Sequence, residues 1–318
     1  MVREQAGRPY NCARLHIGFQ ANALFDAADE LGLMVKHIDE KGFIYFQRIG
    51  GVDPALVRTK RVNIHTADGV VHGVVGATAI HLLERGKEAK APKMSECFID
   101  IGAKNGKDAR KRVNVGDPIT FADDFEMLNE HIGIARAFDN RVGTWTVIEA
   151  LRLAAQAKTK LQCAIFACSS VQEEVGGSGA WMNVENVRPH AAVVVDVSHA
   201  TDSPGIDVKE HGEIKLSAGP TLTIGREHHP ALVSRVRAVG KKKKIPIQME
   251  AFSLTGGTDA LTIHNKQGGV PSCVVGIPNR YMHTTVELLD LRDMQKAADL
   301  LAAFCLDLKK GERFVVKV

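Results

Sequence analysis

The spacing of apolar and polar positions changes partway along this chain. From residue 142 onward, apolar runs of strand length alternate with segments of helical spacing. The apolar runs predict buried strands at residues 161–168, 190–198, 245–252 and 271–278. The segments of helical spacing predict helices at residues 142–157, 229–239, 257–265 and 291–308. Buried strands that alternate with helices are typical of a layered α/β sheet.

Residues 33 to about 130 show a different pattern. Residues 33–49 predict two strands joined by a turn that ends in glycine, and residues 61–76 predict a second hairpin around 67–69. Residues 114–121 continue the same style. We therefore expect a β-rich module inserted between the first α/β element and the rest.

Composition excludes several classes of function. The chain has 318 residues, 45% of them hydrophobic and 25% charged, as in ordinary globular proteins. The net charge of +4 does not suggest a nucleic-acid partner, and the run from Lys241 to Lys244 suits the negative end of a helix dipole. The six cysteines form no CxxC pair, which favours a reduced, cytoplasmic protein. We expect neither a signal peptide nor a membrane span, because no apolar run is long enough.

Candidate chemistry follows the apolar runs. Glu173 and Glu174 come after the run 161–168, Asp196 lies within "VVVDVS", His283 follows "SCVVGIP", and Asp139 precedes a predicted helix. Functional groups of α/β sheets gather beyond the carboxyl ends of strands. Aspartate, glutamate and histidine suit zinc, cobalt or manganese, and a free glutamate can take a proton from water.

Each of these residues also has a structural explanation. Asp139 can cap the helix that follows it, and His283 can be a structural histidine. Glu173 and Glu174 can belong to an exposed loop. Asp196 favours function, because a carboxylate inside an apolar strand needs a partner.

Two further segments stay open at this point. In "GGTDA", residues 256–260, Thr258 or Asp259 can cap a helix, or the segment can face a substrate. His228 and His229 precede Pro230, so they can belong to a plain loop or approach the site.

Five motifs together resemble one known family: "AFDNRVG", "VQEEVGGSGA", "VVVDVSHATDSPG", "FSLTGGTDA" and "IPNRYMHTT". In this order and spacing the chain resembles the tetrahedral aminopeptidases, peptidase family forty-two of the M series, some of them labelled endoglucanase M. The resemblance runs from about Asp26 to the C-terminus.

The resemblance implies an α/β fold. Its catalytic domain is a mixed-sheet zinc-peptidase (phosphorylase/hydrolase-like) domain, expected at residues 1–34 and 131–318 with a short or atypical N-terminal part. The inserted β-rich, PDZ-like dimerisation domain is expected at residues 35–130. It also implies two divalent metal ions, zinc or cobalt, peptide substrates, and self-association from dimer to dodecamer.

The resemblance further implies a role for each candidate residue. Asp139 resembles the bridging carboxylate and Glu173 the general base. Glu174 and His283 resemble ligands of one metal, and Asp196 resembles a ligand of the other.

The stretch "HIDEKG", residues 37–42, looks like the family's first metal motif, but its position argues against that reading. Asp29 lies 21 residues before Gly50 of the Gly-Gly turn, as the family motif requires, whereas Asp39 lies only 11 before it. We therefore expect His37 to belong to a hairpin. Ala27 then stands where the family has a ligand histidine, and Asp29 is the residue that would orient that histidine.

This substitution leaves alternative functions open. The leading hypothesis is a dinuclear-metal aminopeptidase acting on short peptides. The alternative is a catalytically impaired homologue that retains one metal, because of Ala27, and acts in assembly or peptide binding. A third, endoglucanase activity, requires two carboxyl groups about 5 to 9 Å apart across a sugar, and adjacent Glu173 and Glu174 need not face a common bond.

Overall fold

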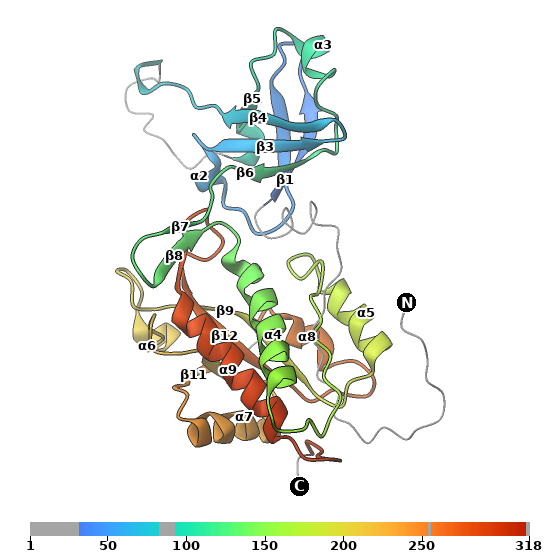
Figure 1. Cartoon of the computed structure of the whole chain (residues 1–318). Helices are drawn as coiled ribbons and strands as arrows, with labels where there is room; N and C mark the ends of the chain where they lie inside the picture. Colours follow the sequence, from blue (N-terminus) through green and yellow to red (C-terminus); the bar gives the residue numbers. More distant parts are fainter. Residues whose placement is uncertain (1–31, 83–92, 254–255, 316–318) are drawn as a thin grey trace.

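A closed barrel forms the N-terminal part of the structure, a computed structural model that describes residues 32–82, 93–253 and 256–315. All of its strand pairs are antiparallel, in the order β1-β2-β5-β4-β3-β6 with β6 pairing back to β1 (Figure 1). Its strands are β1 (Gly32–Ile38), β2 (Ile44–Arg48), β3 (Arg61–Thr66), β4 (Gly69–Val75), β5 (Ile99–Asp100) and β6 (Pro118–Phe121). The short helices near them are α2 (Pro54–Val57), η1 (Ile80–Leu82), η2 (Met94–Glu96) and α3 (Gly106–Ala109).

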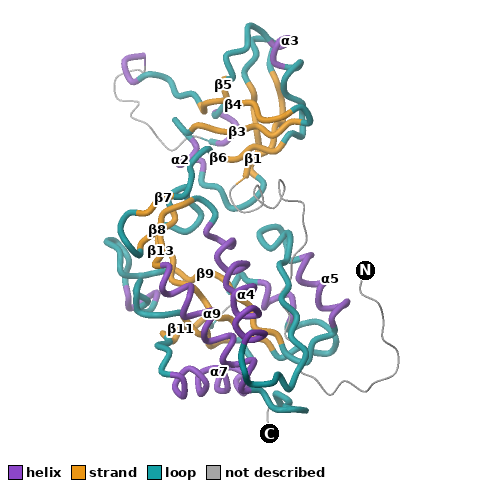
Figure 2. Tube along the Cα trace, viewed as in Figure 1, coloured by secondary structure: helices purple, strands orange, loops and turns teal. Residues whose placement is uncertain are grey.

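A mixed sheet forms the larger part of the molecule, in the order β11-β10-β12-β13-β8-β7 with β9 paired to β12. β9 runs parallel to β12, whereas β13 runs antiparallel to it, which confirms the expected mixed sheet. Its strands are β7 (Glu126–Met127), β8 (Ile132–Ala135), β9 (Ala192–His199), β10 (Thr221–Gly225), β11 (Gln248–Phe252), β12 (Ser272–Arg280) and β13 (Glu287–Asp290). The helices around it are α4 (Phe138–Gln156), α5 (Ser178–Val187), α6 (Val208–His211), α7 (Pro230–Lys243), α8 (Asp259–Ile263) and α9 (Leu291–Asp307). Figure 2 shows the two regions as separate bodies of strand, with the long helices beside the mixed sheet.

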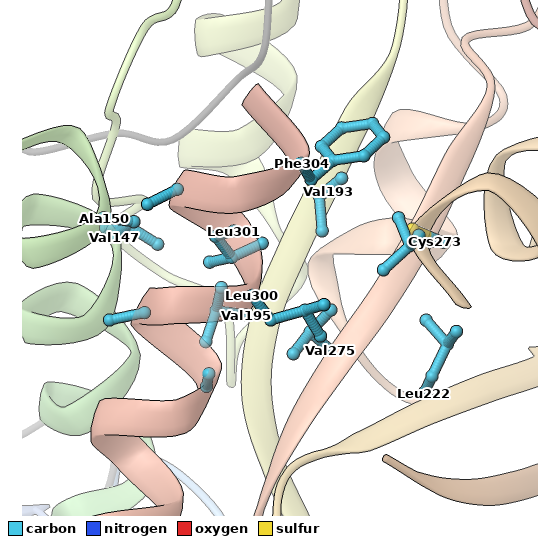
Figure 3. Packing of buried hydrophobic residues seen from close by; sticks show 14 of the residues in the cluster. Val147, Ala150, Val193, Val195, Leu222, Cys273, Val275, Leu300, Leu301 and Phe304 are labelled. Carbon is cyan, nitrogen blue, oxygen red and sulfur yellow. The ribbon is translucent and has the colours of Figure 1, made fainter. Parts of the chain in front are cut away.

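The main hydrophobic core lies between one face of the mixed sheet and helices α4, α7 and α9. Side chains alternate along a strand, so Val193 and Val195 of β9 point to the same face. Val275 of β12 lies beside them, and Leu301 and Phe304 of α9 pack onto them (Figure 3). α9 is therefore amphipathic because one of its sides closes this core.

The other face of the sheet carries polar side chains. By the same alternation, Asp196 and Ser198 of β9 point away from the α4–α9 core. Thr221 and Thr223 of β10 and Glu250 of β11 join them there through hydrogen bonds and a shared cavity. Polar side chains are thus concentrated on the face of the sheet opposite the α4–α9 core.

The barrel touches the mixed-sheet region near residues 281–286. The Lys60 amine donates to the Asp123 carboxylate at 3.0 Å and also to the Thr285 hydroxyl. At Gly51, a side-chain Cβ would lie 3.0 Å from Nδ1 of His283. A loop of the barrel therefore packs directly against the segment that carries a candidate metal ligand.

Most of the elements expected from the sequence are confirmed. The predicted strands at residues 190–198, 245–252 and 271–278 are β9, β11 and β12, and the predicted helices are α4, α7, α8 and α9. The strand predicted at 161–168 is wrong: this segment has only an isolated bridge at Ile165. A strand requires hydrogen-bonded neighbours, and an apolar run alone does not supply them.

The change from one sheet to the other falls between Phe121 and Glu126, because β7 pairs with β8 of the mixed sheet. This point lies a few residues before the expected boundary at 130–131, and β1 begins at Gly32, ahead of the expected start at 35. The PDZ-like and dimerisation parts of the expectation stay predictions. Across the described ranges, no helix has the length and apolar character needed to span a bilayer.

Candidate functional site

Asp139 is positioned by an irregular first turn of α4. Asp139 and Asn140 have non-helical backbone angles, and the peptide bond between them is cis. Asn140 Oδ1 accepts a hydrogen bond from the Gly143 amide at 2.9 Å, as a capping side chain does. Asn140 therefore takes the capping role that the sequence offered to Asp139. The buried Asp139 carboxylate instead faces His283.

His283 lies between two carboxylates. Its Nε2 atom is 3.2 Å from Asp139 Oδ2 and 3.2 Å from Glu174 Oε1. Hydrogen bonds to Asp139 and Glu174 raise the pKa of His283 to about 10. One nitrogen carries only one hydrogen, so the two carboxylates compete for it, and a shared cation would satisfy all three groups. The possible ligand atoms of these residues lie within 4.8 Å of one another.

Glu287 holds two of these three residues in place. Its Oε2 atom accepts the Asp139 backbone amide at 3.0 Å, and its Oε1 atom accepts the His283 amide at 2.9 Å. The side chain is fully buried on β13, and burial raises the pKa of Glu287 to about 7. The sequence reasoning missed Glu287, although "TTVELLD" places a carboxylate inside an apolar strand, the same signal that pointed to Asp196.

Glu173 and Glu174 lie in a tight turn before α5. The Gly177 amide donates to the Gln172 carbonyl at 2.7 Å, and Gln172 has a positive φ of 62°. The turn presents both carboxylates to the cavity described below. Burial raises the pKa of Glu173 to about 8, with further repulsion from Asp259, Glu174 and Asp139.

Asp196 lies on the same cavity from β9. It is only 8% exposed. The pKa of its carboxyl is raised well above the usual value, first by burial and then by repulsion from Asp139 and Glu173. Among the described residues, its hydrogen-bond donor is the neighbouring Val197 amide at 2.9 Å, and no lysine or arginine pairs with it. The carboxylate is therefore chemically suited to a metal ion.

These residues meet in one cavity of about 260 Å³. The cavity also takes in the end of β11 and the segment before α8, through Phe252, Gly256 and Thr258. Thr258 caps α8, because its hydroxyl accepts a hydrogen bond from the Ala260 amide. The same residue of "GGTDA" also lines the cavity. His228 lines the cavity as well, and its Nδ1 is buried without a hydrogen-bond partner among the described residues.

The remaining sequence candidates fall elsewhere. Asp29 and Ala27 lie outside the described residues. His37 lies on β1 and pairs with Tyr45 of β2, and the Asp39 carboxylate accepts the Lys41 and Phe43 amides in the turn between those strands. The prediction that "HIDEKG" is a hairpin is confirmed.

The donor set fits a divalent metal ion. Asp139, Glu174 and His283 supply two carboxylate oxygens and one imidazole nitrogen, a ligand combination suited to zinc, cobalt or manganese. The pKa of nearby Glu173 and Asp196 is raised, first by burial and then by repulsion among the carboxylates of the cavity. A cation would relieve this repulsion.

Comparison with known proteins identifies what this arrangement resembles. The chain matches the family described as M42 glutamyl aminopeptidase over residues 21–300. A putative aminopeptidase of Acetivibrio thermocellus is 34% identical over 282 residues, covering 87% of this chain and 80% of that protein.

Two solved structures share the fold. A TET aminopeptidase from the marine sediment archaeon Thaumarchaeota archaeon SCGC AB-539-E09 superposes with a TM-score of 0.85 at 31% identity, covering 96% of this chain and 84% of that one. The TET1 peptidase of Pyrococcus horikoshii, described as assembling into a tetrahedron or a large octahedral shell, gives 0.79 at 28% identity, covering 95% and 86%.

Proposed function

The chain belongs to the M42 glutamyl aminopeptidase family, and from this premise we propose that it removes amino-terminal residues from short peptides by metal-assisted hydrolysis. The observation that carries the proposal is the convergence of Asp139, Glu174 and His283 on one point, with Glu173 beside them in the same cavity.

In this proposal Asp139, Glu174 and His283 hold one divalent ion, zinc or cobalt. Asp139 and Asp196 face a second position. A divalent ion bound here supplies Lewis-acid polarisation of the scissile carbonyl and lowers the pKa of water. Glu287 accepts hydrogen bonds from the backbone amides of Asp139 and His283. These bonds hold the two ligand side chains in position for the metal ion.

Glu173 acts as the general base. Its raised pKa of about 8 suits a group that must both accept and release a proton near neutral pH. It takes a proton from the attacking water as the water oxygen bonds to the carbonyl carbon. It then delivers that proton to the leaving amine as the C–N bond breaks, so the group ends each cycle as it began.

The experiment is hydrolysis of amino-acid anilides and dipeptides by the full chain supplied with zinc or cobalt. Glu173→Gln keeps the shape of the side chain but cannot accept the proton, so kcat/KM should fall by about 10²- to 10⁴-fold. Chelator should abolish activity, and added metal should restore it. Peptide hydrolysis that survives Glu173→Gln would refute the assigned role.

A second candidate is a catalytically impaired homologue that acts in assembly or peptide binding. Ala27 favours it, because this residue stands where the resemblance places a ligand histidine. Elemental mass spectrometry of metal-supplied protein separates the two readings. Two metals per chain support the dinuclear enzyme, whereas one metal with negligible turnover, restored by Ala27→His, supports the impaired homologue.

We further propose that the chain self-associates through the barrel, from dimer toward dodecamer. Exposed apolar side chains lie on one barrel strand, with Val70 at 50% and Val74 at 48% exposure on β4. Light scattering coupled to size exclusion tests this. Val74→Lys should shift the mass toward the monomer if β4 lies in the interface, whereas an unchanged mass assigns the interface elsewhere.

A further inference from the structure

We infer that Glu250 forms the end of a specificity pocket that accepts a basic side chain, lysine or arginine, at the amino-terminal position of the peptide. This inference rests on the proposed aminopeptidase function and names the substrate class of the same site. Glu250 lies on β11, away from the candidate metal ligands, and it has no part in the proton transfer assigned above.

Three hydroxyl groups orient the Glu250 carboxylate. Its Oε2 atom accepts from Thr223 Oγ1 at 3.0 Å, from Ser198 Oγ at 3.1 Å and from Thr221 Oγ1 at 3.4 Å. These donors come from β9 and β10. The carboxylate therefore points from the edge strand β11 toward the middle of the sheet. Gly276 makes room for the network, because a Cβ there would lie 1.9 Å from Ser198 Oγ.

The other carboxylate oxygen is left for a ligand. All three hydroxyls lie within 3.4 Å of Oε2, with Ser198 and Thr221 also bonded to each other, and Oε1 has no hydrogen-bond partner within the described part of the chain. Oε1 is not fully buried, and the Glu250 side chain lines the cavity. Oε2 is thus held by hydrogen bonds within the protein, and Oε1 is available to a ligand in the cavity.

The distance from the metal ligands suits a long side chain. Ser198, which contacts Glu250, is two residues beyond Asp196 on the same face of β9. Two residues of a strand span about 6.5 Å. An extended lysine or arginine side chain covers a comparable length, so a peptide with its first carbonyl near Asp139 and His283 can place its cationic end at Glu250.

The charge and shape of the cavity favour a cation with an apolar stem. No lysine or arginine lines the cavity among the residues that the structure describes. Val274 and Phe252 provide apolar surface in the same cavity. Burial raises the pKa of Glu250 and the three hydroxyl donors oppose this rise, so an incoming ammonium would complete the stabilisation of the carboxylate.

The same reasoning excludes an acidic side chain. A glutamate at this position would bring a second carboxylate beside Glu250 without a cation to separate them. The family description names glutamate, so this chain is expected to differ from that description in its preference. Glu250 is then a specificity-determining residue rather than a catalytic one.

The test compares aminoacyl coumarins of lysine, norleucine and glutamate on the metal-supplied full chain. Norleucine matches the lysine stem but lacks the ammonium. The wild-type kcat/KM ratio of lysine to norleucine should be at least about 10, and Glu250→Gln should bring it close to 1. The ratio is the readout because any general loss of activity cancels from it. Glu250→Lys should reverse the preference toward glutamate, and exposed Glu185→Gln on α5 is the matched control.

The outcomes separate this inference from the proposed function. Equal or faster hydrolysis of norleucine, or a ratio that survives Glu250→Gln, overturns the inference and leaves the aminopeptidase standing. If no substrate is cleaved, the proposed function fails, and calorimetry with L-lysinamide and L-norleucinamide decides the inference. Tighter binding of lysinamide by about tenfold, lost in Glu250→Gln, supports the pocket; equal binding or none refutes it.

Discussion

The barrel and the mixed-sheet region bury different kinds of side chain. Among described residues 32–121, the buried polar group is Thr120, and the rest of that interior is apolar. The mixed-sheet region buries Asp139, Asp196, Glu287 and Asp290 alongside an apolar core. Burying a carboxylate is costly unless donors or a cation compensate. The barrel is therefore stabilised by apolar packing, whereas the mixed-sheet region contains buried carboxylates whose cost must be offset by a structural or functional role.

Within the mixed-sheet region, two buried carboxylates illustrate the structural and the functional role. Asp290 accepts hydrogen bonds from Ser217 and from Arg292, which hold its pKa down at about 2 against the effect of burial. Within the described part of the chain, Asp196 has only a neighbouring amide as donor, and its pKa is raised, first by burial. The first carboxylate is structural because the protein satisfies it. The second has no such set of donors among the described residues, which makes it a candidate site residue.

The largest expected effect tests the barrel as a plain hydrophobic core. Ile64 of β3 is fully buried in the barrel, so Ile64→Ala should reduce the free energy of unfolding by about 2–5 kcal/mol. Because the candidate site lies in the other region, kcat/KM of the folded variant should stay unchanged. Urea titration measures the stability, with exposed Val115→Ala before β6 as the control. A large loss of kcat/KM at low temperature would show that the two regions are coupled more tightly than their cores suggest.

The next effect concerns pH and is confined to the mixed-sheet region. Glu287 and Glu173 have a usual pKa of 4.5 and ionise in the folded protein at about 7 and about 8. Between pH 4.5 and 8 the unfolded chain therefore loses these protons first, which favours unfolding. Metal-free protein should lose several kcal/mol of stability as the pH rises across this window, and it should regain that stability below pH 4.5.

Hydrogen exchange locates that loss. Amides of β9 and β13 should exchange faster at pH 8 than expected from exchange chemistry alone, while amides of β3 and β4 should not. Added zinc should remove the difference, because a cation stabilises the ionised carboxylates. Equally faster amide exchange in β3 and β4 would contradict the difference between the two regions.

The fold was predictable where one element carries its own pattern. The apolar runs of β9 and β12 and the amphipathic α9 follow directly from period and length. The run at 161–168 is mainly apolar, as β9 is, yet it forms only a bridge at Ile165. What distinguishes the two is the neighbouring strand: β9 pairs with β12 along its whole length. Pairing is a property of the assembled sheet, so local pattern could not decide it.

The site was predictable only in part, for a related reason. Glu174 and His283 were named from their positions after apolar runs and Asp139 from its position before a predicted helix, and the fold brings the three together. Glu287 and Glu250 were missed, although each interrupts an apolar strand as Asp196 does. Their roles depend on cross-strand partners, the amide of His283 for one and the hydroxyl of Thr223 for the other. A rule that examined every carboxylate inside an apolar run would have found both.

A smaller effect is expected from Glu287, which contacts the backbones of Asp139 and His283 without lining the cavity. Glu287→Gln keeps the volume but replaces one acceptor oxygen with a donor, so one of its two backbone contacts is lost. Metal affinity should fall by about 10- to 100-fold. Competition with a fluorescent chelator measures it, and exposed Glu126→Gln on β7 is the control. Unchanged affinity would mean that Asp139 and His283 keep their positions without this carboxylate.

The smallest effect tests whether the barrel shapes the site at all. Gly51 does not need glycine for its backbone conformation, but an alanine Cβ would lie 3.0 Å from Nδ1 of His283. The imidazole must then move by a few tenths of an ångström, which should lower metal affinity by about two- to fivefold, with a larger loss for Gly51→Val. Partly exposed Leu56→Ala on α2 is the control, since it changes the same loop region away from the ring. A graded loss from alanine to valine would show that an apolar barrel contributes to the chemistry of its charged neighbour through one contact. If neither variant changes metal affinity, the barrel touches His283 without positioning it, and the difference between the two regions is complete.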